Sequence, residues 1–89
     1  MAEPTTIQRD LRGLPLWLLR DYLIDLGGQP GEPGLVIGQG WTARLTQLPD
    51  YQIGSLRVGE VRLEVTGLPA ALADLLPPLQ RRLDTRGGG

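Results

Sequence analysis

The stretch Gly59–Gly67, GEVRLEVTG, has the clearest strand pattern in this chain. Val61, Leu63 and Val65 alternate strictly with charged residues, and this period of two predicts a strand with one buried and one solvated face. Strands of that kind belong to antiparallel sheets. Cross-strand ion pairs explain the arginine and glutamate side chains on the solvated face more simply than a binding surface does. The pattern therefore indicates an antiparallel sheet.

The chain before this stretch supplies further strands. Residues Trp41–Leu48 alternate in the same way, and a turn at Gly38–Gly40 joins them to a short strand at Leu35–Ile37. Residues Thr5–Leu11 alternate more loosely and are largely polar, which predicts an edge strand. The segment Gly27–Gly34, GGQPGEPG, which comes directly before Leu35–Ile37, is interpreted as a loop because its turn residues do not hold helix or strand dihedral angles.

Between Trp41–Leu48 and the opening stretch, the sequence predicts one more strand at Gln52–Val58. Gly54 and Ser55 interrupt its apolar pattern and are interpreted as a bulge. Gly59 is interpreted as the turn into the strand Glu60–Thr66. The prediction is thus a sheet with three strands after residue 40.

A helix is predicted at Pro15–Leu26, with Pro15 at its first position and two glycines after its last residue. One arc of this helix is apolar and is expected to pack against the sheet; it consists of Leu16, Leu19, Tyr22, Leu23 and Leu26. Trp17 and Ile24 lie together on another side of the helix. They are either covered by another part of this small protein or form a surface for a partner or a second copy.

A second helix is predicted after Gly67, with Pro69 in its first turn. A stripe of leucines keeps helical phase as far as Leu83. Pro77 and Pro78 each lack an amide donor in the middle of this stripe, so we expect a kink or two short helices near Leu76.

Composition narrows the classes of function. The 89 residues predict a single domain over residues 1–86, followed by a triple-glycine tail at 87–89. The nine basic residues are all arginine and are interspersed with ten acidic ones, which argues against nucleic-acid binding. Lysine, histidine and cysteine are absent, so we expect no enzyme, no cofactor and no metal site. The sequence has no apolar run that would span a membrane and no secretory signal, which predicts a cytoplasmic protein.

Three segments together resemble a known family. Leu14–Gly28, Ile53–Gly67 and the terminal Arg86–Gly89 are similar to the uncharacterised domain that follows a MoaD-like sulfur carrier, the MoaD-related protein C-terminal domain. The resemblance implies an α+β, TBP-like fold with the order β-α-β4-α, in which two helices pack on one face of an antiparallel sheet. This chain lacks the carrier domain, so a carrier would act as a partner in trans.

The resemblance leads to a first hypothesis about function. Ubiquitin-like sulfur carriers end in two glycines whose carboxylate is adenylated and converted to a thiocarboxylate. The chain is therefore expected to be an accessory or carrier-like protein of molybdenum-cofactor or sulfur-transfer metabolism, with Gly87, Gly88 and Gly89 as an activated or processed end. A MoaD-like carrier or its adenylating enzyme is the expected partner.

Two other hypotheses remain open. In the second, the protein is a binding module, in the simplest case a homodimer, that uses Trp17 and Ile24, and the tail is an inert terminus. In the third, a small molecule binds between the sheet and the long C-terminal helix.

Overall fold

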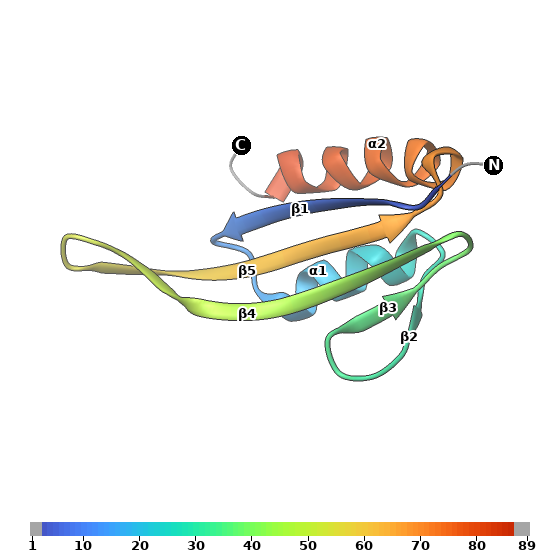
Figure 1. The fold of residues 1–89 in the computed structure, drawn as a ribbon. Helices are drawn as coiled ribbons and strands as arrows, with labels where there is room; N and C mark the ends of the chain where they lie inside the picture. The colour runs from blue at the N-terminus through green and yellow to red at the C-terminus, as the bar shows by residue number, and fades with distance from the viewer. Residues whose placement is uncertain (1–2, 87–89) are drawn as a thin grey trace.

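The computed structural model describes residues 3–86. Five strands and two helices make up this part of the chain (Figure 1). Their bounds are β1 Thr5–Arg12, α1 Leu16–Asp25, β2 Gln29–Pro30, β3 Leu35–Ile37, β4 Trp41–Ile53, β5 Leu56–Gly67 and α2 Pro69–Arg86. The protein is thus an α+β protein, as predicted.

The five strands form one antiparallel sheet in the order β1-β5-β4-β3-β2. β5 lies in the interior of the sheet, with β1 on one side, where Ile7 pairs with Val65, and β4 on the other, where Ala43 pairs with the same residue. The polar strand β1 occupies an edge, which confirms the sequence prediction. The alternating apolar and charged residues at Glu60–Thr66 therefore belong to a strand that is paired on both sides.

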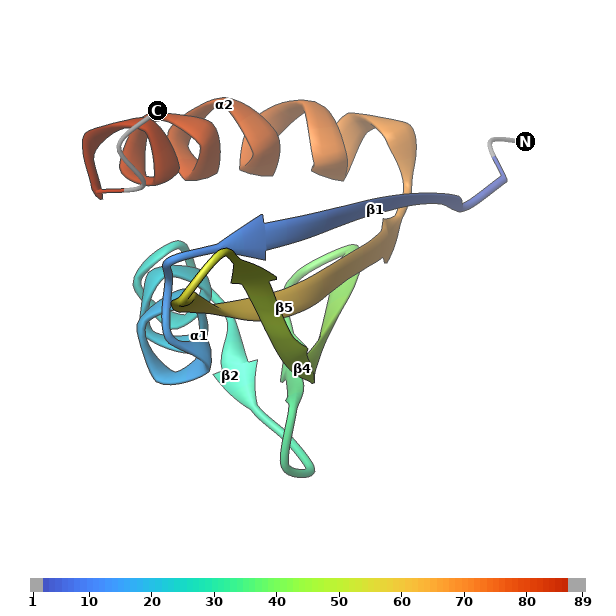
Figure 2. The ribbon, with the colours of Figure 1, turned by 90° about the vertical axis from the view of Figure 1, so that its left-hand side faces the viewer.

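One face of the sheet is buried, and it is the face that the alternation predicted. Val61, Leu63 and Val65 of β5 and Ala43 and Leu45 of β4 are all buried on it. They form one core with buried residues of both helices, which are Leu19, Tyr22 and Leu23 of α1 and Leu72, Leu75, Leu79 and Leu83 of α2. Both helices therefore cover the same face, as the two views show (Figures 1 and 2).

Helix α1 agrees with its prediction except that it is one residue shorter at each end, with Pro15 and Leu26 as its caps. Pro15 precedes the helix as its N-cap with extended backbone angles, and its carbonyl accepts from the amide of Leu19 at 3.3 Å. Proline suits this place because its ring already restricts φ to a negative value. At the other end, Gly27 has a φ of 107°, which glycine adopts without strain.

Helix α2 runs without interruption from Pro69 to Arg86 through Pro77 and Pro78. The expectation of two short helices is therefore wrong. Leucines on both sides of the prolines, Leu75 and Leu79, are buried in the core and hold both halves of the helix against the same sheet. Tertiary packing of this kind outweighs the local preference of the prolines.

Strands β4 and β5 form one long hairpin, which differs from the three shorter strands predicted after residue 40. Its turn is at Gly54–Ser55, where Gly54 has a φ of 57°, and Gly59 lies inside β5. The bulge is instead in β4, where the register shifts between Leu48 and Tyr51. The end of this hairpin extends past both helices (Figure 1). We call the segment Leu48–Val58 the arm.

The loop predicted at Gly27–Gly34 contains the short strand β2. Its two residues pair with β3, Gln29 with Ile37 and Pro30 with Val36. A proline fits this place because β2 is an edge of the sheet, where an amide donor is not needed on the outer side. Within residues 3–86, neither helix has the combination of length and apolar character that a membrane crossing requires.

Candidate functional site

The C-terminal end of α2 is firmly attached to the rest of the protein. Leu83 is buried in the core, and Arg82 forms an ion pair with Asp25 of α1 at 3.1 Å. In the last turn, the Thr85 hydroxyl donates to the Arg81 carbonyl oxygen at 2.8 Å. The tail residues Gly87, Gly88 and Gly89 lie outside the described residues. The chain thus has a fixed attachment point for the tail directly before it.

Trp17 and Ile24 share a side of α1, but their environments differ. The Trp17 side chain is 62% exposed, whereas Ile24 is half-buried and packs against the core. Of the two residues proposed for partner binding, only Trp17 therefore presents a large apolar surface to solvent.

Tyr22 and Arg82 connect the two helices. The Arg82 guanidinium lies 5.9 Å from the centre of the Tyr22 ring, a cation–π distance. The Tyr22 hydroxyl is buried and has no hydrogen-bond partner among residues 3–86. This contact and the Arg82–Asp25 pair hold α2 beside α1 at the end that precedes the tail.

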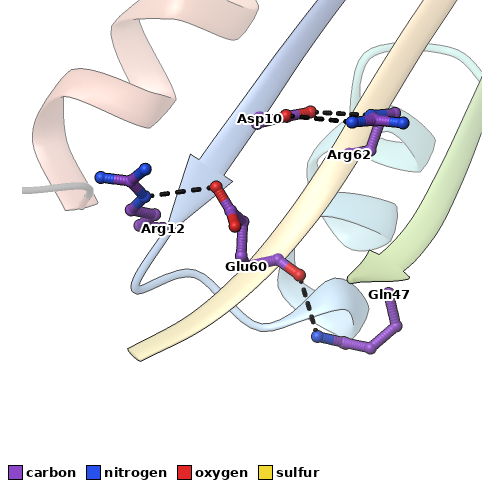
Figure 3. A network of polar contacts seen from close by, with 5 residues as sticks. All are labelled: Asp10, Arg12, Gln47, Glu60 and Arg62. Carbon is purple, nitrogen blue, oxygen red and sulfur yellow. Dashed lines mark hydrogen bonds and ion pairs between the residues drawn. The ribbon is translucent and has the colours of Figure 1, made fainter. Parts of the chain in front are cut away.

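The second face of the sheet is polar and carries ion pairs between neighbouring strands (Figure 3). Arg62 of β5 donates two hydrogen bonds to Asp10 of β1, at 3.0 and 3.3 Å. These bonds hold the pKa of the Asp10 carboxyl below its usual range and raise the pKa of Arg62. Arg12 and Glu60 form a second pair at 3.2 Å. Both pairs are opposite in the register, which confirms the prediction of cross-strand pairing.

The arm carries an apolar surface that the sequence analysis missed. Tyr51, Ile53 and Leu56 are all exposed, and Leu56 is the most exposed of them at 67%. In the register, Tyr51 pairs with Val58 and Ile53 with Leu56, so the four residues share one face of the hairpin. Their period of two on each side of the turn was a usable signal, but it was hidden by the interpretation of Gly54 and Ser55 as a bulge within one strand.

Arg12 lies at the base of this surface. Its guanidinium is 3.5 Å from the centre of the Tyr51 ring while its Nε donates to Glu60. A cation over an aromatic face is attracted by the ring's quadrupole. The side chain of Arg12, the last paired residue of strand β1, therefore reaches the arm and contacts it at Tyr51.

The acidic side chains of the described residues do not gather into a metal site. No group of three or more acidic, histidine or cysteine side chains comes close enough to share a metal ion within residues 3–86. Three of the acidic residues, Asp10, Asp25 and Glu60, are each paired with an arginine.

Comparison with known families shows the protein family to which the chain belongs. The model of the family described as archaeal MoaD-like protein matches residues 7–89, which include both helices, the three glycines and all of the sheet except the first two residues of β1. The chain belongs to the archaeal MoaD-like protein family. No curated protein matches it. The match confirms the MoaD-like relationship expected from the sequence and relates this MoaD-like chain to the molybdopterin sulfur carriers.

Proposed function

We propose that this MoaD-like protein is a non-enzymatic accessory or carrier-like protein of molybdenum-cofactor or related sulfur-transfer metabolism. In this proposal Gly87–Gly89 are the activated or processed end. The observation that carries it is the family match over residues 7–89, because it extends through the last helix into the three glycines. The finer assignment, a TBP-like domain of the kind found behind a MoaD-like carrier, is supported by the order of one strand, one helix, four strands and one helix.

The chemistry needs only a reachable carboxylate. The Gly89 carboxylate attacks the α-phosphorus of ATP and releases pyrophosphate, which leaves an acyl-adenylate. A hydrosulfide-equivalent donor then displaces AMP, so that a C–S bond replaces the C–O bond to phosphate and a thiocarboxylate results. In this proposal the partner enzyme supplies every catalytic group.

The attachment of the tail suits this role. Three extended residues span at most about 10 Å, so an enzyme that binds the tail must also approach the end of α2. The end of α2 is held against α1 by the ion pair between Arg82 and Asp25, and against the core by the buried side chain of Leu83. Because glycine has no side chain, such a tail can enter a narrow cleft.

The absence of lysine restricts the chemistry further. An activated carboxylate can form an isopeptide bond only with an amine. Side chains of this protein offer none, so it can donate its C-terminus but cannot accept another carrier on a side chain.

The test is an intact mass spectrum of the protein isolated from its own cells. Replacement of one C-terminal oxygen by sulfur, localised to Gly89 by fragmentation, supports the proposal. The control is a variant that lacks Gly88 and Gly89 but keeps the melting temperature of the full chain. An unmodified carboxylate in cells whose other sulfur carriers are thiocarboxylated, or full function of the shortened variant, contradicts the proposal.

A second candidate function rests on Trp17, whose indole is 62% exposed. In this alternative the protein forms a homodimer through α1, and the tail is inert. Sedimentation should then show a dimer that Trp17→Ala converts to a monomer without a change in melting temperature. Leu56→Ala on the arm is the matched control, since it also removes an exposed apolar side chain. A monomeric wild-type protein excludes this candidate.

A further inference from the structure

An apolar cavity of about 200 Å³ lies between α2 and the sheet. Ile7 of β1 and Leu63 and Val65 of β5 line it from the sheet, and Leu76 and Leu79 line it from the helix. Leu63, Val65 and Leu79 are buried, whereas Ile7 and Leu76 are half-buried. The cavity therefore extends from the protein surface into the core, in the place where the sequence analysis left a small-ligand site open.

The cavity has room for a small apolar body. An apolar cavity of about 150 Å³ stays free of water and holds a molecule the size of benzene. At about 200 Å³, this one accommodates a six-carbon chain or a substituted ring. Pro77 contributes to the open side, where it is exposed and its compact ring takes the place of a longer side chain.

One charged residue, Arg9, lines the cavity within the part of the chain that the structure describes. Arg9 is exposed, and its guanidinium donates to the side-chain oxygen of Gln80, which also lines the cavity. None of the ion pairs formed among residues 3–86 includes Arg9. Arginine has five N–H donors, so most of them remain for a ligand after the bond to Gln80.

We propose that this cavity binds a small amphiphilic monocarboxylate. The apolar body lies between Ile7 and Leu76, and the carboxylate accepts hydrogen bonds from Arg9 at the surface. Charge-assisted bonds between guanidinium and carboxylate are about twice as strong as neutral ones, which gives the site its preference for an acid. This inference does not depend on the proposed role of the tail.

A nearby acid allows a specific check of the electrostatics. Asp84 accepts a hydrogen bond from the Gln80 amide at 2.8 Å, so it lies one side chain away from Arg9. The negative charge of Asp84 repels the carboxylate of an incoming ligand, and this repulsion acts through space at the protein surface. Neutralising Asp84 should therefore tighten the binding of an acid without affecting a neutral ligand.

The experiment is a titration of the full chain with hexanoate, followed by carbon-proton NMR of the leucine and isoleucine methyl groups. Hexan-1-ol, which has the same body without the charge, is the matched ligand. We expect hexanoate to shift the methyl signals of Ile7, Leu76 and Leu79 with a Kd of about 1 mM and hexan-1-ol to bind about tenfold more weakly.

Three variants separate the contributions. Arg9→Gln should lower the affinity for hexanoate to that for hexan-1-ol. Asp84→Asn should raise the affinity for hexanoate alone, by about twofold to fivefold. Ile7→Phe should fill the cavity and abolish the binding of both ligands. The proposal is overturned if neither ligand shifts these methyl signals at about 10 mM, or if Arg9→Gln binds hexanoate as well as wild type. Shifts confined to the surface around Arg81 and Arg82 overturn it as well.

Discussion

Asp10 and Arg62 face each other across β1 and β5 and share two hydrogen bonds, from Arg62 Nε to Oδ1 at 3.0 Å and from a terminal guanidinium nitrogen to Oδ2 at 3.3 Å. The two residues are direct register partners. This two-bond geometry matches the planar fork of arginine to the carboxylate. The pair therefore fixes both the alignment of the edge strand and the protonation of Asp10.

The first prediction concerns pH. The pKa of Asp10 is lower in the folded protein, chiefly because of the hydrogen bonds from Arg62. A lowered carboxyl pKa stabilises the fold above the unfolded value of about 4, and this stabilisation is lost as the pH falls through the folded value. Asp10→Asn should therefore be less stable than wild type in urea at about pH 7, and the difference should shrink at about pH 2.5.

Asp50→Asn, on the exposed bulge of β4, is the control for this measurement. It changes the net charge by the same amount but removes no ion pair among residues 3–86. An Asp10→Asn variant whose deficit in unfolding free energy is the same at both pH values contradicts the prediction.

The second prediction concerns the buried Tyr22 hydroxyl, which lacks a hydrogen-bond partner within residues 3–86. A buried polar group without a partner costs about 1–3 kcal/mol. Tyr22→Phe should thus leave the unfolding free energy unchanged or raise it by about 1 kcal/mol. Denaturation in urea measures this, with Tyr51→Phe on the exposed arm as the comparison. A loss of stability specific to Tyr22→Phe would show that the hydroxyl is hydrogen-bonded in solution.

The third prediction compares two glycines with left-handed backbone angles. Gly13 has a φ of 79° and open space around its Cα, whereas at Gly34, with a φ of 81°, an added Cβ would lie 2.7 Å from the Leu45 carbonyl oxygen. Gly13→Ala should cost about 1–2 kcal/mol for the backbone conformation alone. Gly34→Ala should cost about 1–3 kcal/mol more because of the clash. Equal losses in urea denaturation would show that the backbone around Gly34 relaxes freely.

The fourth prediction concerns the prolines of α2. An alanine at position 78 restores an amide that can donate to the Asp74 carbonyl oxygen, and proline in a helix interior is about 3 kcal/mol less favourable than alanine. Because Pro78 is half-buried, part of this gain is lost with its contacts. Pro78→Ala should raise the unfolding free energy by about 1–2 kcal/mol.

Pro69 provides the matched control, since it is the first residue of the same helix. A proline at that position interrupts no helical hydrogen bond. Pro69→Ala should be nearly neutral, and a Pro78→Ala variant that is no more stable than Pro69→Ala rules out a helical penalty at position 78.

The features that could be predicted from the sequence are those fixed by neighbouring residues. Helix α1 is bounded by Pro15 and Gly27, and its apolar arc became its buried face. The alternation in β5 correctly gave the buried side of the sheet because a period of two assigns side chains to faces without knowledge of the partner strand.

The features that were missed depend on distant parts of the chain. Gly59 and Gly54 look alike in the sequence, yet Gly54 has a φ of 57° in a turn, while the Gly59 carbonyl oxygen accepts a bond from the Gly13 amide at 2.9 Å and lies within a strand. Continuity of α2 likewise depends on leucines that pack against another element. The cavity beside Arg9 arises only when β1 and α2 meet.

The position of β5 between β1 and β4 also imposes an order on synthesis and folding. β1 ends at Arg12, but the strand with which it pairs begins at Leu56, and the second of the two helices that cover the sheet follows at Pro69. A nascent chain must therefore carry β1 unpaired until β5 has left the ribosome. Pairing over such separations slows folding, since the intervening chain must first be closed into a loop. The largely polar side chains of β1 then keep the waiting segment from associating with other chains.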